Sequence, residues 1–271
     1  TAHQMSSYKM IVMDMDDALL NSENQVSPDT AKYLIELQDK GYHVVLASGR
    51  PTEGMLPIAK DLHLHEHDSY VISFNGSRTT RVRDGELEAE QSISKKDFDR
   101  IVDYCRDNNI FVLTYQDGHI IYEGEHEYMN IESELTGLPM HRTDDLKAFI
   151  QNPVAKVLGV DYESHIQELS QAFGGVFNDQ IDVTTSKPFF LEFVPHGVSK
   201  GNALHALCEK VGIDISETIA FGDSMNDYSM MEEAGYAVAM GNARDALKEI
   251  ADFVTLDHNS DGIVYALKKI L

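Results

Sequence analysis

Short apolar runs alternate with amphipathic segments of helical length at both ends of the chain. The runs "KMIVMD", "HVVLAS" and "TIAFGD" are apolar at almost every position, and segments such as "SPDTAKYLIELQDKG" separate them. Strands that are apolar throughout are typical of a parallel sheet whose two faces are both covered by helices. The sequence therefore predicts an α/β fold, and such sheets bind ligands at the carboxyl ends of their strands.

The middle of the chain has a different pattern. Asp84-Gly85 lies between two alternating runs, which is a hairpin signal. The helix-like segment "SKKDFDRIVDYCRDN" and strand-like runs such as "FVLTYQDGHIIYE" follow it. We predict an inserted α+β domain with antiparallel strands at residues 84–188, while residues 5–83 and 189–271 form the α/β core.

Aspartates gather where two of the predicted strands end. Asp14 and Asp16 follow the first apolar run, and Asp223 and Asp227 follow "TIAFG". Residues i and i+2 of a strand face the same side, so Asp14 and Asp16 are expected to face one space. Aspartates of this kind also serve as helix caps or in solvated turns.

A cluster of these aspartates would need a cation. Each pair of like charges at ~4 Å costs on the order of 4 kcal/mol at an effective dielectric constant near ~20. Carboxylate and carbonyl oxygens suit Mg²⁺, a hard ion with octahedral coordination. The sequence therefore predicts a Mg²⁺ site. An EF-hand calcium loop is excluded because its glycine position is occupied by Leu19 or Tyr228.

Two further segments offer groups that bind phosphate. Ser199 is a good helix N-cap, and Lys200 follows it in the first turn, where a cation opposes the helix dipole unless an anion is bound. An exposed lysine is the alternative. Ser48 and Gly49 end another apolar run and supply a hydroxyl and a close backbone N–H. Arg50 is either a phosphate ligand or one partner of a structural ion pair.

Composition narrows the choice of partners. The chain has 22 Lys and Arg against 45 Asp and Glu, a formal net charge of −23, which opposes binding to nucleic acid or to acidic membranes. It has neither an apolar run of about 20 residues nor a signal-peptide pattern, so we expect a cytoplasmic protein, either a monomer or a small homo-oligomer. Cys105 and Cys208 are expected to be buried and unpaired.

The segments "DMDDALL", "ASGR", "GVSKG" and "GDSMND" occur in this order along the chain. Together they resemble the four motifs of the haloacid dehalogenase superfamily of phosphohydrolases, in particular its Cof-type branch, which is sugar-phosphatase-like. The resemblance covers essentially the whole chain. It implies a Rossmann-like core, whose parallel sheet is flanked by helices, and a large α/β cap inserted between the second and third motifs.

The resemblance also implies an activity and its residues. The protein would be a Mg²⁺-dependent phosphatase that hydrolyses a small phosphorylated metabolite, with sugar phosphates favoured. Asp14 would be the nucleophile that forms an aspartyl-phosphate, and Asp16 would be the general acid and then the general base. The phosphate would be held by Ser48, Gly49, Lys200 and Asn226. The metal would be held by the Asp14 carboxylate, the Asp16 backbone carbonyl, Asp223 and Asp227.

One position departs from the pattern of the family. Its first motif usually has the form Asp-x-Asp-Gly-Thr or Asp-x-Asp-Asp-Thr, and Ala18 replaces the threonine here. This change motivates an alternative, a weakened family member that binds phosphometabolites as a sensor. A phosphomutase is a second alternative, but residues 84–188 contain no clear second phosphate cluster.

Overall fold

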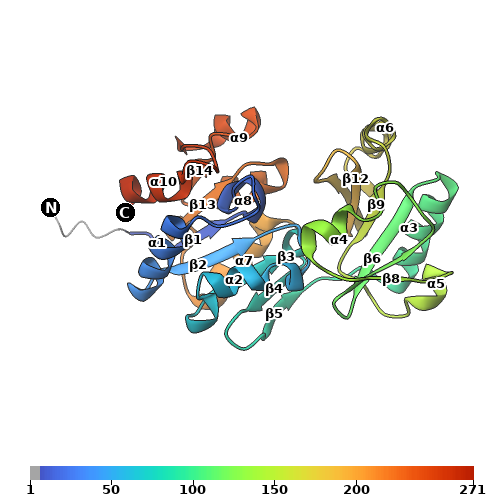
Figure 1. Ribbon diagram of the computed structural model, residues 1–271, viewed down its shortest axis with the longest axis horizontal. Helices are drawn as coiled ribbons and strands as arrows, with labels where there is room; N and C mark the ends of the chain where they lie inside the picture. The colour runs from blue at the N-terminus through green and yellow to red at the C-terminus, as the bar shows by residue number, and fades with distance from the viewer. Residues whose placement is uncertain (1–6) are drawn as a thin grey trace. The chain divides into compact units, whose positions relative to one another are not determined.

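The computed structural model describes residues 7–271 and divides into two compact units, shown in Figure 1. One unit contains the chain up to Ala89 together with Ser199–Leu271, and the other is Glu90–Val198. Residues 5 and 6, where the predicted core begins, lie outside the described residues. The second unit is thus an insertion within the first.

The first unit contains an eight-stranded sheet in the order β15-β14-β13-β1-β2-β3-β4-β5. The pairs from β15 to β3 are all parallel, and β4 is antiparallel to β3. The predicted parallel sheet is therefore confirmed. The strands are β1 (Met10–Met13), β2 (His43–Ala47), β3 (Tyr70–Ser73), β4 (Arg78–Arg81), β5 (Leu87–Glu90), β13 (Thr218–Gly222), β14 (Tyr236–Ala239) and β15 (Phe253–Val254).

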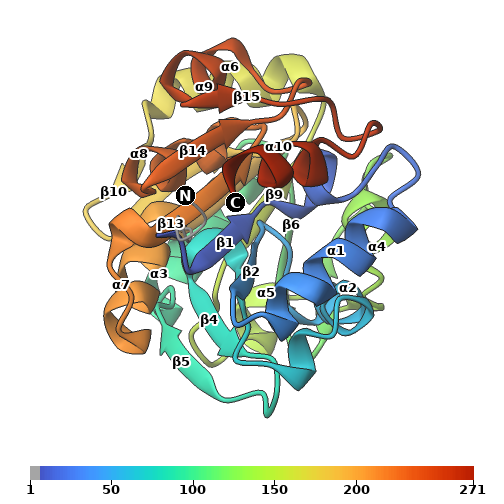
Figure 2. The same ribbon diagram turned by 90° about the vertical axis from the view of Figure 1, so that its left-hand side faces the viewer.

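Helices cover both faces of this sheet, which explains why its central strands are apolar throughout. Ile11 and Met13 of β1 belong to one apolar core and Met10 and Val12 to the other, because successive side chains of a strand point to opposite faces. Figure 2 shows β13, β1 and β2 side by side among these helices. The helices are α1 (Pro28–Asp39), α2 (Leu56–Asp61), α7 (Lys200–Val211), α8 (Tyr228–Glu233), α9 (Asp245–Ile250) and α10 (Gly262–Ile270).

The second unit is a seven-stranded sheet in the order β10-β11-β12-β9-β6-β7-β8, with four helices. Its strand pairs are antiparallel except for β7 and β8. The predicted α+β insertion is therefore confirmed. Its elements are α3 (Lys95–Asp107), β6 (Phe111–Gln116), β7 (His119–Glu123), α4 (Ile131–Thr136), β8 (Met140–Arg142), α5 (Leu146–Phe149), β9 (Val157–Val160), α6 (Glu163–Phe173), β10 (Val176–Asn178), β11 (Ile181–Thr185) and β12 (Phe190–Pro195).

The chain passes between the units at 89/90 and 198/199, whereas the sequence places the boundaries at 83/84 and 188/189. The predicted hairpin forms around Gly85, whose φ is +71°, but it adds β5 to the first sheet beside β4. Strand β12 pairs with β9 and β11 of the second sheet. The alternating pattern indicates a strand but not the sheet that receives it, because pairing partners are chosen in three dimensions.

The sequence also has two cysteines and no long apolar run, and the structure bears on both features. Cys105 and Cys208 are both buried and unpaired, as expected. Among residues 7–271, no helix has the length and apolar character needed to cross a membrane.

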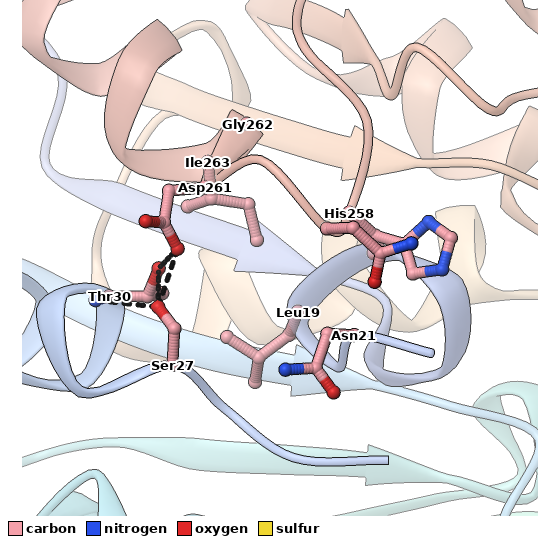
Figure 3. Close-up of a pocket in the computed structure, with 10 residues that line it drawn as sticks. Leu19, Asn21, Ser27, Thr30, His258, Asp261, Gly262 and Ile263 are labelled. Atoms are coloured by element: carbon pink, nitrogen blue, oxygen red, sulfur yellow. Dashed lines mark hydrogen bonds between the residues drawn. The ribbon is translucent and has the colours of Figure 1, made fainter. Parts of the chain in front are cut away.

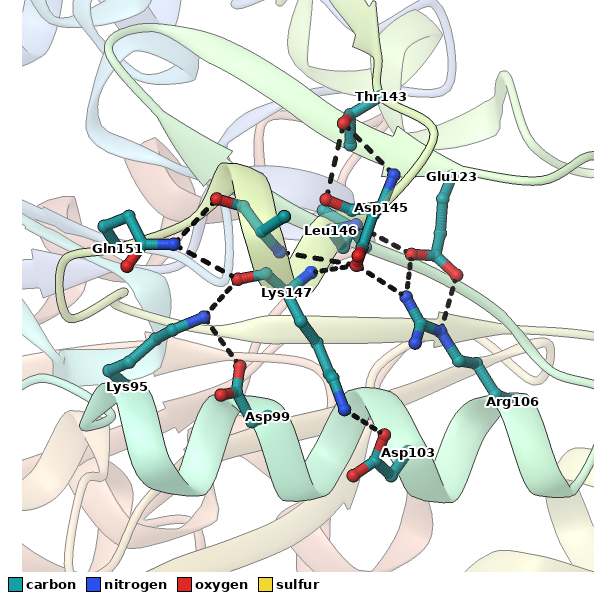
Figure 4. A network of polar contacts seen from close by, with 11 residues as sticks. Lys95, Asp99, Asp103, Arg106, Glu123, Thr143, Asp145, Leu146, Lys147 and Gln151 are labelled. Atoms are coloured by element: carbon teal, nitrogen blue, oxygen red, sulfur yellow. Dashed lines mark hydrogen bonds and ion pairs between the residues drawn. The ribbon is translucent and has the colours of Figure 1, made fainter.

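A network of ion pairs links α3 to the neighbouring elements of the second unit (Figure 4). The Arg106 guanidinium lies 2.6 Å from Glu123 Oε1 and 3.0 Å from Asp145 Oδ1. Burial alone raises the pKa of Glu123, but hydrogen bonds from Arg106 and from the Leu146 N–H outweigh it, so the pKa lies below its ordinary value. Arg106 therefore stabilises the ionised form of Glu123 and joins α3 to β7 and α5.

We expect Arg106→Met to lower the free energy of unfolding by about 1–2 kcal/mol at pH 7, because Glu123 loses a bidentate partner. The pKa of Glu123 is lowered in the folded state, so this contribution is complete above the unfolded pKa, about 4.3, and is lost as the pH falls through the folded pKa. Urea unfolding of both proteins at pH 7 and below pH 4 measures it.

Arg100→Met is the matched control, because Arg100 lies on the same helix but is 56% exposed and 3.7 Å from its partner. It should cost less than about 0.5 kcal/mol at either pH. If the difference in free energy of unfolding between wild type and Arg106→Met were as large below pH 4 as at pH 7, Arg106 would not stabilise the ionised form of Glu123.

Candidate active site

Asp14 lies immediately after β1, at the carboxyl edge of the sheet. Its backbone N–H donates to the Phe221 carbonyl of β13 at 3.1 Å, so it stays tied to the neighbouring strand. Its side chain caps the turn Met15–Leu19, in which Asp16 and Asp17 have non-helical backbone angles. The strand ends at Met13, so Asp14 and Asp16 follow it, and their carboxylates bond to different partners, Lys200 and Arg50.

Lys200 is buried and bridges two carboxylates. Its ammonium Nζ lies 3.0 Å from Asp14 Oδ1 and 2.7 Å from Asp227 Oδ1. The predicted cap is present, since the Ser199 side chain accepts from the Asn202 N–H. Burial alone would lower the pKa of Lys200, but Asp14 and Asp227 outweigh it and raise the pKa, so the ammonium remains charged. The alternative of an exposed lysine is thereby excluded, because Lys200 is 1% exposed.

Three carboxylates converge beside this ammonium. Asp14, Asp223 and Asp227 each offer an oxygen, and these oxygens lie within 4.8 Å of one another. Burial, followed by the charge of Asp227, raises the pKa of Asp14 well above its ordinary value. Burial also raises the pKa of Asp223 to about 7. The cluster therefore carries more negative charge than one ammonium stabilises.

Asp223 provides the direct indication that a divalent ion fits here. Its Oδ1 is buried and has no hydrogen-bond donor among the described residues. A buried acceptor without a partner is costly, whereas a hard cation would satisfy it together with the oxygen of Asp14. The donor set consists of carboxylate oxygens only, which suits Mg²⁺ rather than a softer metal.

Asp227 is already well supplied with donors. Its Oδ2 accepts from the backbone N–H groups of Asp223 and Ser224, at 2.9 and 3.2 Å, and its Oδ1 accepts from Lys200. A Cβ at Gly222 would lie 2.5 Å from the Asp227 Cβ, so this close approach requires glycine. These contacts favour a role for Asp227 in orienting Lys200 and the Asp223 loop.

The Asp16 carboxylate lies with Arg50 and not with the cluster. Arg50 Nε donates to Oδ2 at 3.0 Å and its NH2 nitrogen to Oδ1 at 2.7 Å, a bidentate arrangement. Of the two alternatives for Arg50, the structure therefore has the ion pair. Arg50 is in turn positioned beside Ser48, whose Oγ accepts from the Arg50 N–H at 3.0 Å.

Ser48, Gly49 and Asn226 meet at Asn75, which the sequence did not single out as a site residue. A Cβ at Gly49 would lie 2.8 Å from Asn75 Oδ1, and the Asn226 side-chain amide donates to that oxygen at 3.2 Å. Asn75 is buried and has a φ of +60°. An Asn-Gly pair directly after a strand, in "SFNGS", was the signal for this turn.

Ala18 is buried at the base of the same turn as Asp16. It borders a cavity of about 30 Å³, whose polar lining includes Ser27, Thr30 and Asp261 (Figure 3). The Ser27 hydroxyl donates to Asp261 Oδ1 at 2.5 Å, and the Thr30 hydroxyl at 3.1 Å. A cavity of this size is enough for roughly one water molecule, so there is room beside Ala18 for a slightly larger side chain.

Comparisons with known proteins match nearly the whole chain. A family model described as haloacid dehalogenase-like hydrolase matches residues 11–267. Phosphatase YwpJ of Bacillus subtilis is 30% identical over 97% of this chain and 100% of its own length. A crystal structure of a haloacid dehalogenase-like hydrolase from Bacteroides thetaiotaomicron is 35% identical, with a TM-score of 0.91, over 97% of this chain and 100% of that one.

We expect Lys200→Met to lower the free energy of unfolding by about 3–5 kcal/mol, because it leaves buried carboxylates without their counter-charge. Lys210→Met is the matched control on the same helix. Lys210 is 54% exposed and pairs with Glu88 at 2.8 Å, so its loss should cost less than about 1 kcal/mol. Urea unfolding at pH 7.5 measures both, and equal losses for the two variants would refute the role given to Lys200.

Proposed function

The chain belongs to the haloacid dehalogenase-like hydrolase family and is a phosphatase, and we propose that it hydrolyses a small phosphorylated metabolite in a Mg²⁺-dependent reaction through an aspartyl-phosphate on Asp14. The observation that carries this proposal is the buried Lys200 ammonium between Asp14 and Asp227, beside the unpartnered oxygen of Asp223. Lys200 places a positive charge beside the proposed carboxylate nucleophile, where it lowers the repulsion between that carboxylate and a phosphate dianion.

In the proposed first step, an Asp14 carboxylate oxygen attacks phosphorus. The new bond joins that oxygen to phosphorus as the bond to the ester oxygen of the substrate breaks. Asp16, which must carry a proton at the start of this step, donates it to the departing oxygen and becomes a carboxylate, so the first product leaves as an alcohol. For this step the Asp16 side chain must exchange its contact with Arg50 for the leaving group, which frees the guanidinium to face the phosphate.

In the second step, Asp16 accepts a proton from water and the water oxygen attacks the phosphorus of the aspartyl-phosphate. The bond to Asp14 breaks, inorganic phosphate leaves, and the Asp14 carboxylate is restored. Asp16 thus serves as acid and then as base at one position, which microscopic reversibility allows. Lys200 balances the charge of Asp14 in both steps. Its ammonium is buried, so water does not screen its attraction to the Asp14 carboxylate.

The remaining site residues hold the phosphate and the metal in this proposal. Ser48 supplies a hydroxyl, Gly49 a backbone N–H, and Asn226 an amide that Asn75 orients. Bound Mg²⁺ would supply positive charge to the phosphate oxygens and lower the repulsion between nucleophile and substrate. It would be held by the carboxylates of Asp14 and Asp223 and by the Asp16 carbonyl, with Asp227 as a ligand or a support.

The proposed substrate class is a sugar phosphate or a related polyol phosphate. The 5-amino-6-(5-phospho-D-ribitylamino)uracil phosphatase YcsE of Bacillus subtilis is 30% identical over 96% of this chain and 94% of its own length. Its name describes a phosphate on a ribityl chain, which is a polyol. This likeness supports testing sugar and polyol phosphates before nucleotides and other cofactors.

The first test is phosphate release from a panel of sugar, polyol, nucleotide and cofactor phosphates, with and without Mg²⁺. We expect release that needs the metal and falls at least 10³-fold in Asp14→Asn, because removing an attacking group eliminates the covalent route. Sugar or polyol phosphates should have the highest kcat/KM. If Mg²⁺ and a phosphometabolite bind but no ester is cleaved, the chain is a sensor and the proposed reaction is wrong.

We expect Ala18→Thr to keep or raise the rate of hydrolysis. The cavity beside Ala18 leaves room for the added atoms, and Ser27 and Asp261 offer polar partners nearby for the hydroxyl. Ala18→Val is the control that adds a similar volume without a hydroxyl. A loss of kcat/KM of tenfold or more in Ala18→Thr would contradict this expectation.

A further inference from the structure

The turn that follows Asp14 contains a residue in the left-handed conformation. Asp17 has φ +60° and ψ +16°, a conformation that non-glycine residues seldom adopt, although Asp does so more readily than most. Asp17 directly follows Asp16 and is exposed at the surface. The Asp16 backbone carbonyl lies in the peptide plane that joins Asp16 to Asp17, so the backbone angles of Asp17 help to set the direction of this carbonyl.

Asn242, on the loop after β14, connects that loop to this turn. Its side-chain amide Nδ2 donates to the Asp17 carbonyl at 2.9 Å. The backbone N–H of His258 donates to Asn242 Oδ1 at 3.0 Å, which orients the amide with Nδ2 toward Asp17. The imidazole of His258, visible in Figure 3, lies 3.8 Å from the Asp17 carboxylate. Two segments distant in sequence therefore converge on one strained residue.

The same loop also holds the second acidic strand end. The backbone N–H of Arg244 donates to the Asp223 carbonyl at 3.0 Å, and that of Met240 donates to the Gly222 carbonyl at 3.1 Å. The loop after β14 thus bonds to the Asp17 carbonyl through the Asn242 side chain, and to the carbonyls of Gly222 and Asp223 through its backbone N–H groups. It fixes the spacing between the Asp14–Asp17 turn and Asp223, which must present their oxygens to one ion.

We propose that Asn242 is a positioning residue of the active site, which holds the Asp17 turn so that Asp14 and the Asp16 carbonyl face Asp223 at the distance a metal ion requires. This inference rests on the proposed phosphatase function. The Asn242 side chain hydrogen-bonds to the Asp17 carbonyl and the His258 N–H rather than to the three-carboxylate cluster or Lys200. It acts through Asp17, and this distinguishes it from a ligand.

The test compares Asn242→Ala, Asp17→Gly and the double variant by calorimetric titration with Mg²⁺, and by kcat and KM on the best substrate of the panel. We expect Asn242→Ala to weaken Mg²⁺ binding and lower kcat by about two- to tenfold, the range that one hydrogen bond supports, while the melting temperature falls by only a few degrees. Glycine adopts the left-handed conformation without support, so in the Asp17→Gly background the loss of Asn242 should cost less than about twofold.

Asn108→Ala is the matched control, because the Asn108 amide also donates to a backbone carbonyl, that of Tyr104 at 2.9 Å, but in the second unit. It should leave Mg²⁺ binding unchanged. The inference is overturned if Asn242→Ala has the Mg²⁺ affinity and kcat of the wild type. It is also overturned if Asn242→Ala lowers these two quantities by the same factor in the Asp17→Gly background as in the wild type. Wild-type protein that binds Mg²⁺ but cleaves no ester overturns the proposed function alone, and wild-type protein that binds no Mg²⁺ overturns both.

Discussion

The buried ammonium of Lys200 is the interaction on which the site depends. Three carboxylates converge at one edge of the sheet, and burial raises the pKa of both Asp14 and Asp223. Lys200 supplies one positive charge within 3.0 Å of Asp14, and it donates to Asp227 as well. The unpartnered oxygen of Asp223 and the three converging carboxylates form a group that could hold a metal ion.

The architecture of the first unit allows this cluster to form. The strands that carry it are covered on both faces by apolar cores, so their ends hold fixed positions relative to one another. Close approaches then bring the polar loops together, since neither Gly49 nor Gly222 leaves room for a side chain. Asn75 and Asn242 connect loops that follow different strands, so the site is held by hydrogen bonds between loops as well as by the sheet.

Much of the fold followed from periodicity and local signals. Fully apolar runs indicated a parallel sheet with helices on both faces, Asp84-Gly85 indicated a hairpin, and Ser199 indicated a helix start. The assignment of that hairpin to a sheet did not follow, because strand alternation looks the same in either sheet. The ion pair between Asp16 and Arg50 also did not follow, because the strand ends before Asp14 and a turn carries Asp16 toward a loop that is distant in sequence.

The sequence by itself determined which residue types stand at the strand ends, since hydrophobic alternation and capping are local properties read over a few positions. It thereby indicated Asp14, Ser48, Lys200 and Asp223 as candidates. Only the tertiary structure decided their partners: Lys200 meets Asp14 across 186 positions, Asp16 meets Arg50, and Asn242 meets Asp17 across 225. A hydrogen bond or ion pair depends on distance in space, and that distance is set by strand order and loop packing rather than by any local pattern.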